Sequence, residues 1–181
     1  MATTLLPQVK CVLILDEDGG RVSTKYYDRQ EFPDHSSELD FETKLFKKTK
    51  NVNARNEADV VLLDSVVAVF RSGAGVHLYV AGSSEENELI LSAVLDTLYE
   101  ALSILLRGQV DRRTMLENLA LVLLTVDELI DGGKLLEMDP NAIANRVLMR
   151  GVDGRQVPNT ELTVRQAVAT AREEFIKRMG N

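Results

Sequence analysis

Carboxylates beside glycines are the first residues in this chain whose types and spacing could do chemistry. Asp16, Asp18 and Gly20 resemble the start of a calcium-binding loop, in which alternate oxygen ligands hold the ion. The twelfth position of such a loop requires a bidentate glutamate, and Tyr27 stands there instead. The segment is therefore interpreted as the turn of a β-hairpin.

Three further motifs resemble catalytic or ligand-binding sequences but are incomplete. Gly82-Ser83-Ser84 resembles a nucleophile elbow, except that Glu86 stands where the second glycine belongs. Gly73-Ala74-Gly75 lacks the third glycine of a dinucleotide-binding loop. The two histidines, His35 and His77, have no second ligand at metal-binding spacing. We therefore predict no catalytic residue, no cofactor and no metal ion.

A group of carboxylates falls near the predicted C-terminal end of a helix. Asp127 and Asp131 share one face of it, and such pairs can do acid-base chemistry, but the sequence places no nucleophile, His or Lys beside them. Negative charge at a helix C-terminus opposes the helix dipole, so we favour a partner protein that supplies positive charge. Leu121 and Leu124 lie on the polar side of the same helix, and we predict that they contact a partner or another part of the chain.

The segment 44–55 carries five basic residues and no acidic one. Because lysines favour the C-terminal end of a helix, a solvated helix end and loop explain this segment. A surface that faces acidic lipid or an acidic protein is the alternative, and the sequence leaves it open.

The composition limits the class of protein. A chain of 181 residues can bury a core, and with 5% aromatic residues that core must consist of Leu, Val, Ile and Ala. A net charge of -7 argues against nucleic acid as a partner. The single cysteine, Cys11, lies in an apolar run, and we find neither a signal peptide nor an apolar run of the ~18 residues that span a membrane. These features predict a cytosolic protein.

Hydrophobic periodicity predicts the element order β-β-α-β-β-β-α-α, followed by further helices. Strands are predicted at 9–15, 21–27, 58–63, 65–71 and 76–82, and helices at 38–48, 86–107, 111–131 and 140–148. The first strand is apolar at nearly every position, so both of its faces should be covered. The order predicts an α/β (α+β) domain, a five-stranded sheet with helices on both faces.

The predicted helix starts and inner faces position the candidate residues. Ser36-Ser37 is the expected cap of the first helix, and Ser83 with Glu86 forms a capping box for the helix 86–107. The apolar side of that helix is wider than the ~100° stripe of an ordinary surface helix, so more than a sheet must cover it. For the helix 111–131 the predicted inner residues are Met115, Leu116, Leu119, Val122, Leu123, Val126 and Ile130.

The chain is predicted to consist of a tail at 1–8, a domain at 9–150, a linker at 151–162 and a C-terminal amphipathic helix at 163–179. The linker is rich in glycine, proline and polar residues. The last helix either packs on the domain or binds a partner in an assembly, and we favour the second.

Several segments together resemble one family. They are VKCVLILDEDGGR (9–21), KYYD (25–28), FETKLFKKT (41–49), GSSEENEL (82–89), LENL (116–119), VDELIDGG (126–133) and LEMDP (136–140). In combination they are similar to the zeta subunits of coatomer, the COPI vesicle coat, which are relatives of the sigma small chains of clathrin adaptors. His77 stands where this family is expected to carry an aromatic residue.

The resemblance implies a longin-like domain with a mostly antiparallel sheet, and a non-catalytic small subunit that pairs with the coatomer gamma subunit. It further implies a coat with the other coatomer subunits, recruited by an Arf-type GTPase to the cytosolic face of Golgi membranes for retrograde and intra-Golgi transport. Membrane and GTPase contacts would fall mainly to larger subunits.

Two alternatives within this resemblance are a sigma-type chain of a clathrin adaptor and a longin-domain trafficking regulator. A longin-type SNARE would need a longer heptad segment than 163–179 provides.

Overall fold

A computed structural model describes residues 7–52, 54 and 57–151. The chain divides into two compact units, Met1–Leu148 and Met149–Asn181, and the sheet with the surfaces of interest belongs to the first. The predicted linker at 152–162 and the predicted helix at 163–179 lie outside the described residues, as does most of the predicted tail at 1–8.

The centre of the fold is a five-stranded antiparallel sheet in the order β2-β1-β5-β4-β3. The presence of five strands confirms the prediction from the sequence. Its strands are β1 (Val9–Asp16), β2 (Arg21–Tyr26), β3 (Asp59–Leu63), β4 (Val66–Ser72) and β5 (Val76–Ser83). The apolar run of β1 is explained by its position, because β1 pairs with β2 on one side and β5 on the other. The strands β2 and β3 form the two edges.

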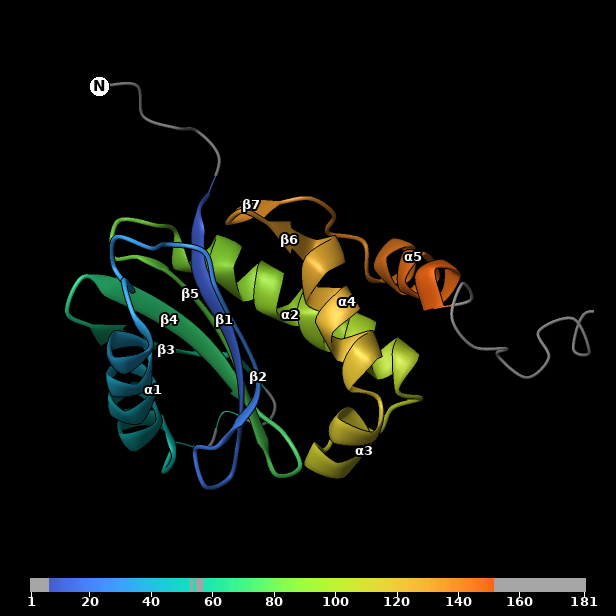
Figure 1. Cartoon of the computed structure of the whole chain (residues 1–181), viewed down its shortest axis with the longest axis horizontal. Helices are drawn as coiled ribbons and strands as arrows, with labels where there is room; N and C mark the ends of the chain where they lie inside the picture. Colours follow the sequence, from blue (N-terminus) through green and yellow to red (C-terminus); the bar gives the residue numbers. More distant parts are fainter. Residues whose placement is uncertain (1–6, 53, 55–56, 152–181) are drawn as a thin grey trace, which may run out of the picture. The chain divides into compact units, whose positions relative to one another are not determined.

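Helices cover both faces of the sheet (Figure 1). The helix α1 (His35–Thr49) lies on one face, over a core that includes Cys11, Leu13, Leu45 and Tyr79. On the other face lie α2 (Glu88–Leu105), α3 (Arg112–Glu117), α4 (Leu119–Leu129) and α5 (Pro140–Gly151). The helix α2 contacts β4 and β5 on its inner side and α4 on its outer side.

The broad apolar face of α2 is therefore buried within the chain. Leu95, Leu98 and Leu102 are fully buried between the sheet and the other helices. The prediction that more than a sheet covers this helix is confirmed. The width of its apolar face, however, gives no separate reason to expect a partner protein on α2.

Both predicted helix caps were wrong in detail. The helix α1 is capped by Asp34, whose carboxylate accepts the Ser37 N–H at 2.8 Å while the Ser37 hydroxyl accepts the Asp34 N–H at 3.3 Å. The helix α2 begins later than predicted, with Asn87 as its cap. Ser83 cannot cap it, because Ser83 is still paired with Val66 in the sheet.

The predicted helix 111–131 is two helices followed by a hairpin. Asn118 ends α3 and precedes α4 with φ -120° and ψ 33°. The chain then leaves the helix and forms β6 (Ile130–Asp131) and β7 (Lys134–Leu135). Gly132 and Gly133 join these strands with φ of 53° and 81°. Two successive positive φ angles suit a two-residue hairpin turn, so the predicted helix cap at these glycines was wrong.

Candidate partner interface

The inner face of α4 differs from the predicted one. Leu121 and Leu124, predicted on the polar side, are partly buried against the main core, so the predicted contact with the chain itself is confirmed. Leu123 was predicted to be buried and is 46% exposed. The face is rotated because two polar side chains, Thr125 and Glu128, are buried on it.

Each of these buried polar side chains has a local reason to lie inside. The Thr125 hydroxyl donates to the Leu121 carbonyl at 2.7 Å, which satisfies it within the helix. The Glu128 carboxylate lies 3.9 Å from the guanidinium of Arg146 on α5. A helix wheel drawn from the sequence places threonine and glutamate on the outward face, and therefore also places Leu121 and Leu124 there.

The rotation leaves a different set of apolar side chains exposed. Leu116 on α3 is 42% exposed, and Ala120 and Leu123 follow it at four- and seven-residue spacing. Ala120 and Leu123 are neighbours on one face of α4, whereas Leu116 lies on α3, before the break at Asn118. We call the three side chains the α3–α4 surface. Leu116, like Leu123, was predicted to be an inner residue, and that prediction was wrong for both.

Asp127 has a partner within the chain. Its carboxylate forms an ion pair with Lys25 of β2, 102 positions away in sequence, and both side chains are partly exposed. The prediction that no lysine accompanies this cluster was therefore wrong. Asp131 lies exposed on β6. Burial raises the pKa of the nearby Tyr27 hydroxyl, and the charges of Asp127 and Asp131 raise it further. The contact of Asp127 and Asp131 with a partner stays a prediction.

A second exposed apolar surface lies at the opposite edge of the sheet. Val60 is 47% and Leu62 is 57% exposed on β3, which pairs with β4 on one side only. Their alternation places both on the α2 side of the sheet, because Val61 packs into the core under α1. An edge strand with exposed apolar side chains can accept another chain. Two backbone groups of β3 are already bound, because the Val60 N–H donates to the Asp59 carboxylate at 2.8 Å and Lys48 donates to the Leu62 carbonyl at 3.1 Å. We call Val60 and Leu62 the β3 edge.

The turn with the calcium-like spacing is a hairpin, as predicted. The Asp16 carboxylate accepts the N–H groups of Gly20 at 2.6 Å and Asp18 at 3.1 Å, and Arg112 donates to it at 3.1 Å. Burial favours a raised pKa for this carboxyl, but these donors outweigh it and the pKa is lowered. Across the described residues, no three His, Cys, Asp or Glu side chains are grouped to hold a metal ion.

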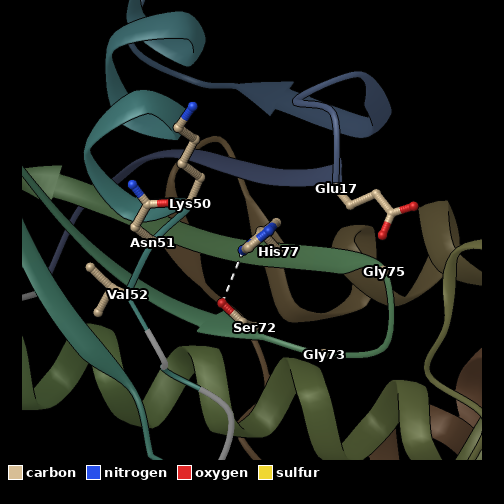
Figure 2. A pocket seen from close by; sticks show the side chains of 8 residues that line it. All are labelled: Glu17, Lys50, Asn51, Val52, Ser72, Gly73, Gly75 and His77. Carbon is tan, nitrogen blue, oxygen red and sulfur yellow. Dashed lines mark hydrogen bonds between the residues drawn. The ribbon is translucent and has the colours of Figure 1, made fainter.

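A polar pocket of about 490 Å³ lies beside His77 (Figure 2). Its wall includes Lys50, Glu17 and the β4–β5 turn. The His77 Nδ1 and the Ser72 hydroxyl are 2.9 Å apart, a pairing that resembles a base and a nucleophile. The two residues are cross-strand neighbours in the β4–β5 ladder, so sheet register alone brings them together.

The ring of His77 has a packing role. It stacks on Tyr79 at 6.3 Å and meets the edge of Phe46 at 5.6 Å. Burial lowers the pKa of His77, which favours the neutral ring. The histidine thus occupies the place of the aromatic residue that the family resemblance leads one to expect. Cys11 is fully buried, and burial raises the pKa of its thiol, which disfavours the reactive thiolate.

The sheet order and the helices on its two faces define the small-chain fold of vesicle adaptors. One chain in a homology model of the full-length AP-3 complex in a stretched open conformation has this fold, with a TM-score of 0.62. The match covers 80% of this chain and 95% of that one, and at 15% identity it shows the fold alone. The family of the clathrin adaptor complex small chain matches residues 8–153.

Relatives of known name define the family more closely. Coatomer subunit zeta-1 of Arabidopsis thaliana is 43% identical over 173 residues, which cover 96% of this chain and 97% of the relative. Coatomer subunit zeta-1 of Homo sapiens is 43% identical over 167 residues, covering 92% and 90%. The chain belongs to the coatomer zeta subunits, within the clathrin adaptor complex small chain family. It is a small subunit of a vesicle coat, and the resemblance found in its sequence is confirmed.

Among the helices that the structure describes, none is long and apolar enough to cross a membrane.

Proposed function

We propose that this chain is the non-catalytic small subunit of a COPI coat and pairs directly with the coatomer gamma subunit. The observation that carries the proposal is the identity of 43% with coatomer zeta subunits over nearly the whole of both chains. In this role it acts in Golgi-to-ER retrograde and intra-Golgi transport. It is cytoplasmic and peripheral on the cytosolic face of Golgi membranes and COPI vesicles.

The exposed apolar surfaces are the proposed contacts with the gamma subunit. Leucine and valine side chains that are about half exposed in the free chain gain stabilisation when a partner removes them from water. The α3–α4 surface and the β3 edge are such places. Leu121, Leu124 and Asp127 lie on α4 with Ala120 and Leu123, and Asp131 follows on β6. The other coatomer subunits, the Arf-type GTPase and the Golgi membrane are reached mainly through the larger subunits. No nucleic acid is involved.

Co-expression with the gamma subunit of the same organism tests the pairing. The full chain should elute with gamma as a one-to-one complex, and it should melt at a higher temperature in the complex than alone, because a partner that binds only the folded state stabilises it. Clathrin-adaptor large chains serve as the comparison. A chain that binds one of these and ignores gamma would be a sigma-type subunit, and the proposal would be wrong.

A further inference from the structure

The C-terminal end of α1 carries a cluster of lysines that the coat contacts proposed above do not use. Lys44, Lys47, Lys48 and Lys50 are all exposed. We call these four residues the α1 lysine patch. The first three lie at three- and four-residue spacing and so are neighbours on the helix surface. Arg55, the fifth basic residue of the predicted segment, lies outside the described residues.

The patch differs from other cationic side chains of the chain because its charges are not neutralised. Lysines and arginines on β1, β2, β4, α3 and α5 form ion pairs with carboxylates. Within the described residues, no ammonium group of the patch lies within 4.0 Å of a carboxylate. Lys48 donates to the Leu62 carbonyl at 3.1 Å instead.

Several exposed carboxylates of the described residues belong to the same part of the chain but form no ion pair with the patch. Asp40 is exposed on α1, one turn before Lys44, and Glu17 lines the same pocket as Lys50 (Figure 2). Asp59 and Asp64 are exposed at the two ends of β3, whose Leu62 carbonyl accepts from Lys48, and neither pairs with a lysine of the patch. The helix dipole accounts for lysines in the last turn of α1, but its effect falls off within that turn, and Lys44 lies before it.

We propose that the α1 lysine patch binds the anionic headgroups of a membrane surface. Lysines are flexible point charges that suit a fluid array of anions, whereas fixed carboxylates on a protein are typically recognised by arginine in a bidentate geometry. The patch contains lysines only, of which Lys44, Lys47 and Lys48 are exposed on α1 and Lys50, at its C-cap, also lines the pocket beside His77. Val52, exposed next to it, can enter the headgroup region.

The position of the patch is compatible with partner binding. The helix α1 covers one face of the sheet, and α3 and α4 lie on the other (Figure 1). A large subunit bound at the α3–α4 surface therefore leaves the lysines free. At the β3 edge, Lys48 donates to the Leu62 carbonyl and would lie beside a bound partner, whereas no hydrogen bond joins Lys44 or Lys47 to that edge among the described residues. This inference deepens the proposed coat function, because it gives the small subunit a membrane contact of its own. It rests on the proposed coat function only because that function determines which membrane the chain encounters.

Binding of the full-length chain to vesicles tests the proposal. We expect binding to phosphatidylserine-rich vesicles that weakens as salt is raised, and none to phosphatidylcholine vesicles. Lys44→Glu with Lys47→Glu should lower the affinity by at least about tenfold, since each lysine near such a surface contributes about fivefold. Both side chains are exposed, so circular dichroism should show an unchanged fold.

A matched control is available on the opposite side of the sheet. Arg107→Glu with Lys134→Glu changes the net charge of the chain by the same amount as Lys44→Glu with Lys47→Glu. Because charges farther than a Debye length of ~10 Å from the membrane are screened, the affinity of this control for vesicles should change little. If both double variants lose the same affinity for anionic vesicles, binding depends only on the net charge of the chain, and the proposal is wrong. Absence of binding to the anionic vesicles would also overturn the proposal.

An acidic protein as the occupant is the remaining outcome. If Lys44→Glu with Lys47→Glu leaves vesicle binding intact and weakens capture of the gamma subunit, the patch is a protein contact and the proposal is wrong. The vesicle measurement uses this chain alone, so its result is independent of whether the pairing with gamma holds.

Discussion

Two pairs of leucines on neighbouring positions of α3 and α4 provide the sharpest test of the proposed interface. Leu116→Glu with Leu123→Glu places two charges on the exposed α3–α4 surface. Leu121→Glu with Leu124→Glu adds the same charge to side chains that pack against the core. We expect the first pair to weaken binding of the gamma subunit without loss of stability, and the second to destabilise the chain itself.

The exposure of the leucines sets the magnitude of the first effect. Complete burial of a leucine contributes about 1.5–3 kcal/mol. Leu116 and Leu123 are a little under half exposed in the free chain, so the burial that remains for a partner contributes about 1 kcal/mol each. Loss of both contacts should weaken binding by about thirtyfold. The free energy of unfolding of the chain alone should change by less than about 1 kcal/mol.

The second effect follows from placing charge against the core. Leu121→Glu with Leu124→Glu removes packed apolar surface and partly buries two carboxylates, which should cost about 2 kcal/mol or more. For a domain of this size that lowers the melting temperature by roughly 4–8 °C. Thermal unfolding of the isolated chains and calorimetric titration with gamma measure both quantities. Unchanged affinity in the first variant, or an unchanged melting temperature in the second, would refute the assignment of the two faces.

Three further predictions concern the stability of the chain. Gly133→Ala should lower the melting temperature more than Gly132→Ala. Both positions have positive φ, but a Cβ at Gly133 would lie 2.7 Å from the Val9 carbonyl oxygen, whereas a Cβ at Gly132 meets nothing within 4 Å. Equal decreases of the melting temperature would contradict this. Deletion of residues 152–181 should lower the melting temperature by no more than a few degrees, which corresponds to a loss of about 1 kcal/mol in the free energy of unfolding. A truncated chain that fails to fold would show that this segment belongs to the core. Asp16→Asn should destabilise the chain most at neutral pH, because the lowered pKa of Asp16 means that its ionised form stabilises the fold. The difference in stability between this variant and the unchanged chain should shrink as the pH falls below 3.8, the ordinary pKa of an aspartate, and disappear below the lowered pKa of Asp16. A difference in urea midpoint that does not depend on pH would contradict this role of the carboxylate.

The fold could be predicted because its signals are local and periodic. The apolar run of β1 indicates a strand covered on both faces, and β1 indeed lies inside the sheet with helices on each side. The Gly73–Gly75 turn separates β4 from β5 as predicted. Strand bounds agree within about a residue, since several strand ends lie at glycine or charged residues such as Asp16, Asp64 and Gly73.

The candidate contacts could not be predicted as well, because they depend on distant pairings. The sequence gives no sign that Lys25 reaches Asp127, which lies 102 positions away. Nor does it show that Thr125 and Glu128 are buried, because their local hydrogen bond and ion pair appear only in the fold. Polar side chains on an inner face rotate the apparent apolar stripe, and Leu123 was misplaced for this reason.

The surfaces that remain exposed constrain how a partner can bind. The helix α4 contacts β2 at one edge of the sheet, and β3 is the opposite edge, about 20 Å away across five strands spaced ~4.8 Å apart. The helix α2 lies between them on the same face, and its Leu89 and Ile104 are exposed. A partner that covers both the α3–α4 surface and the β3 edge must therefore pass over α2. A large chain that curves around this face of the domain fits that requirement, whereas a partner that docks on one edge leaves the exposed apolar side chains of the other edge in water.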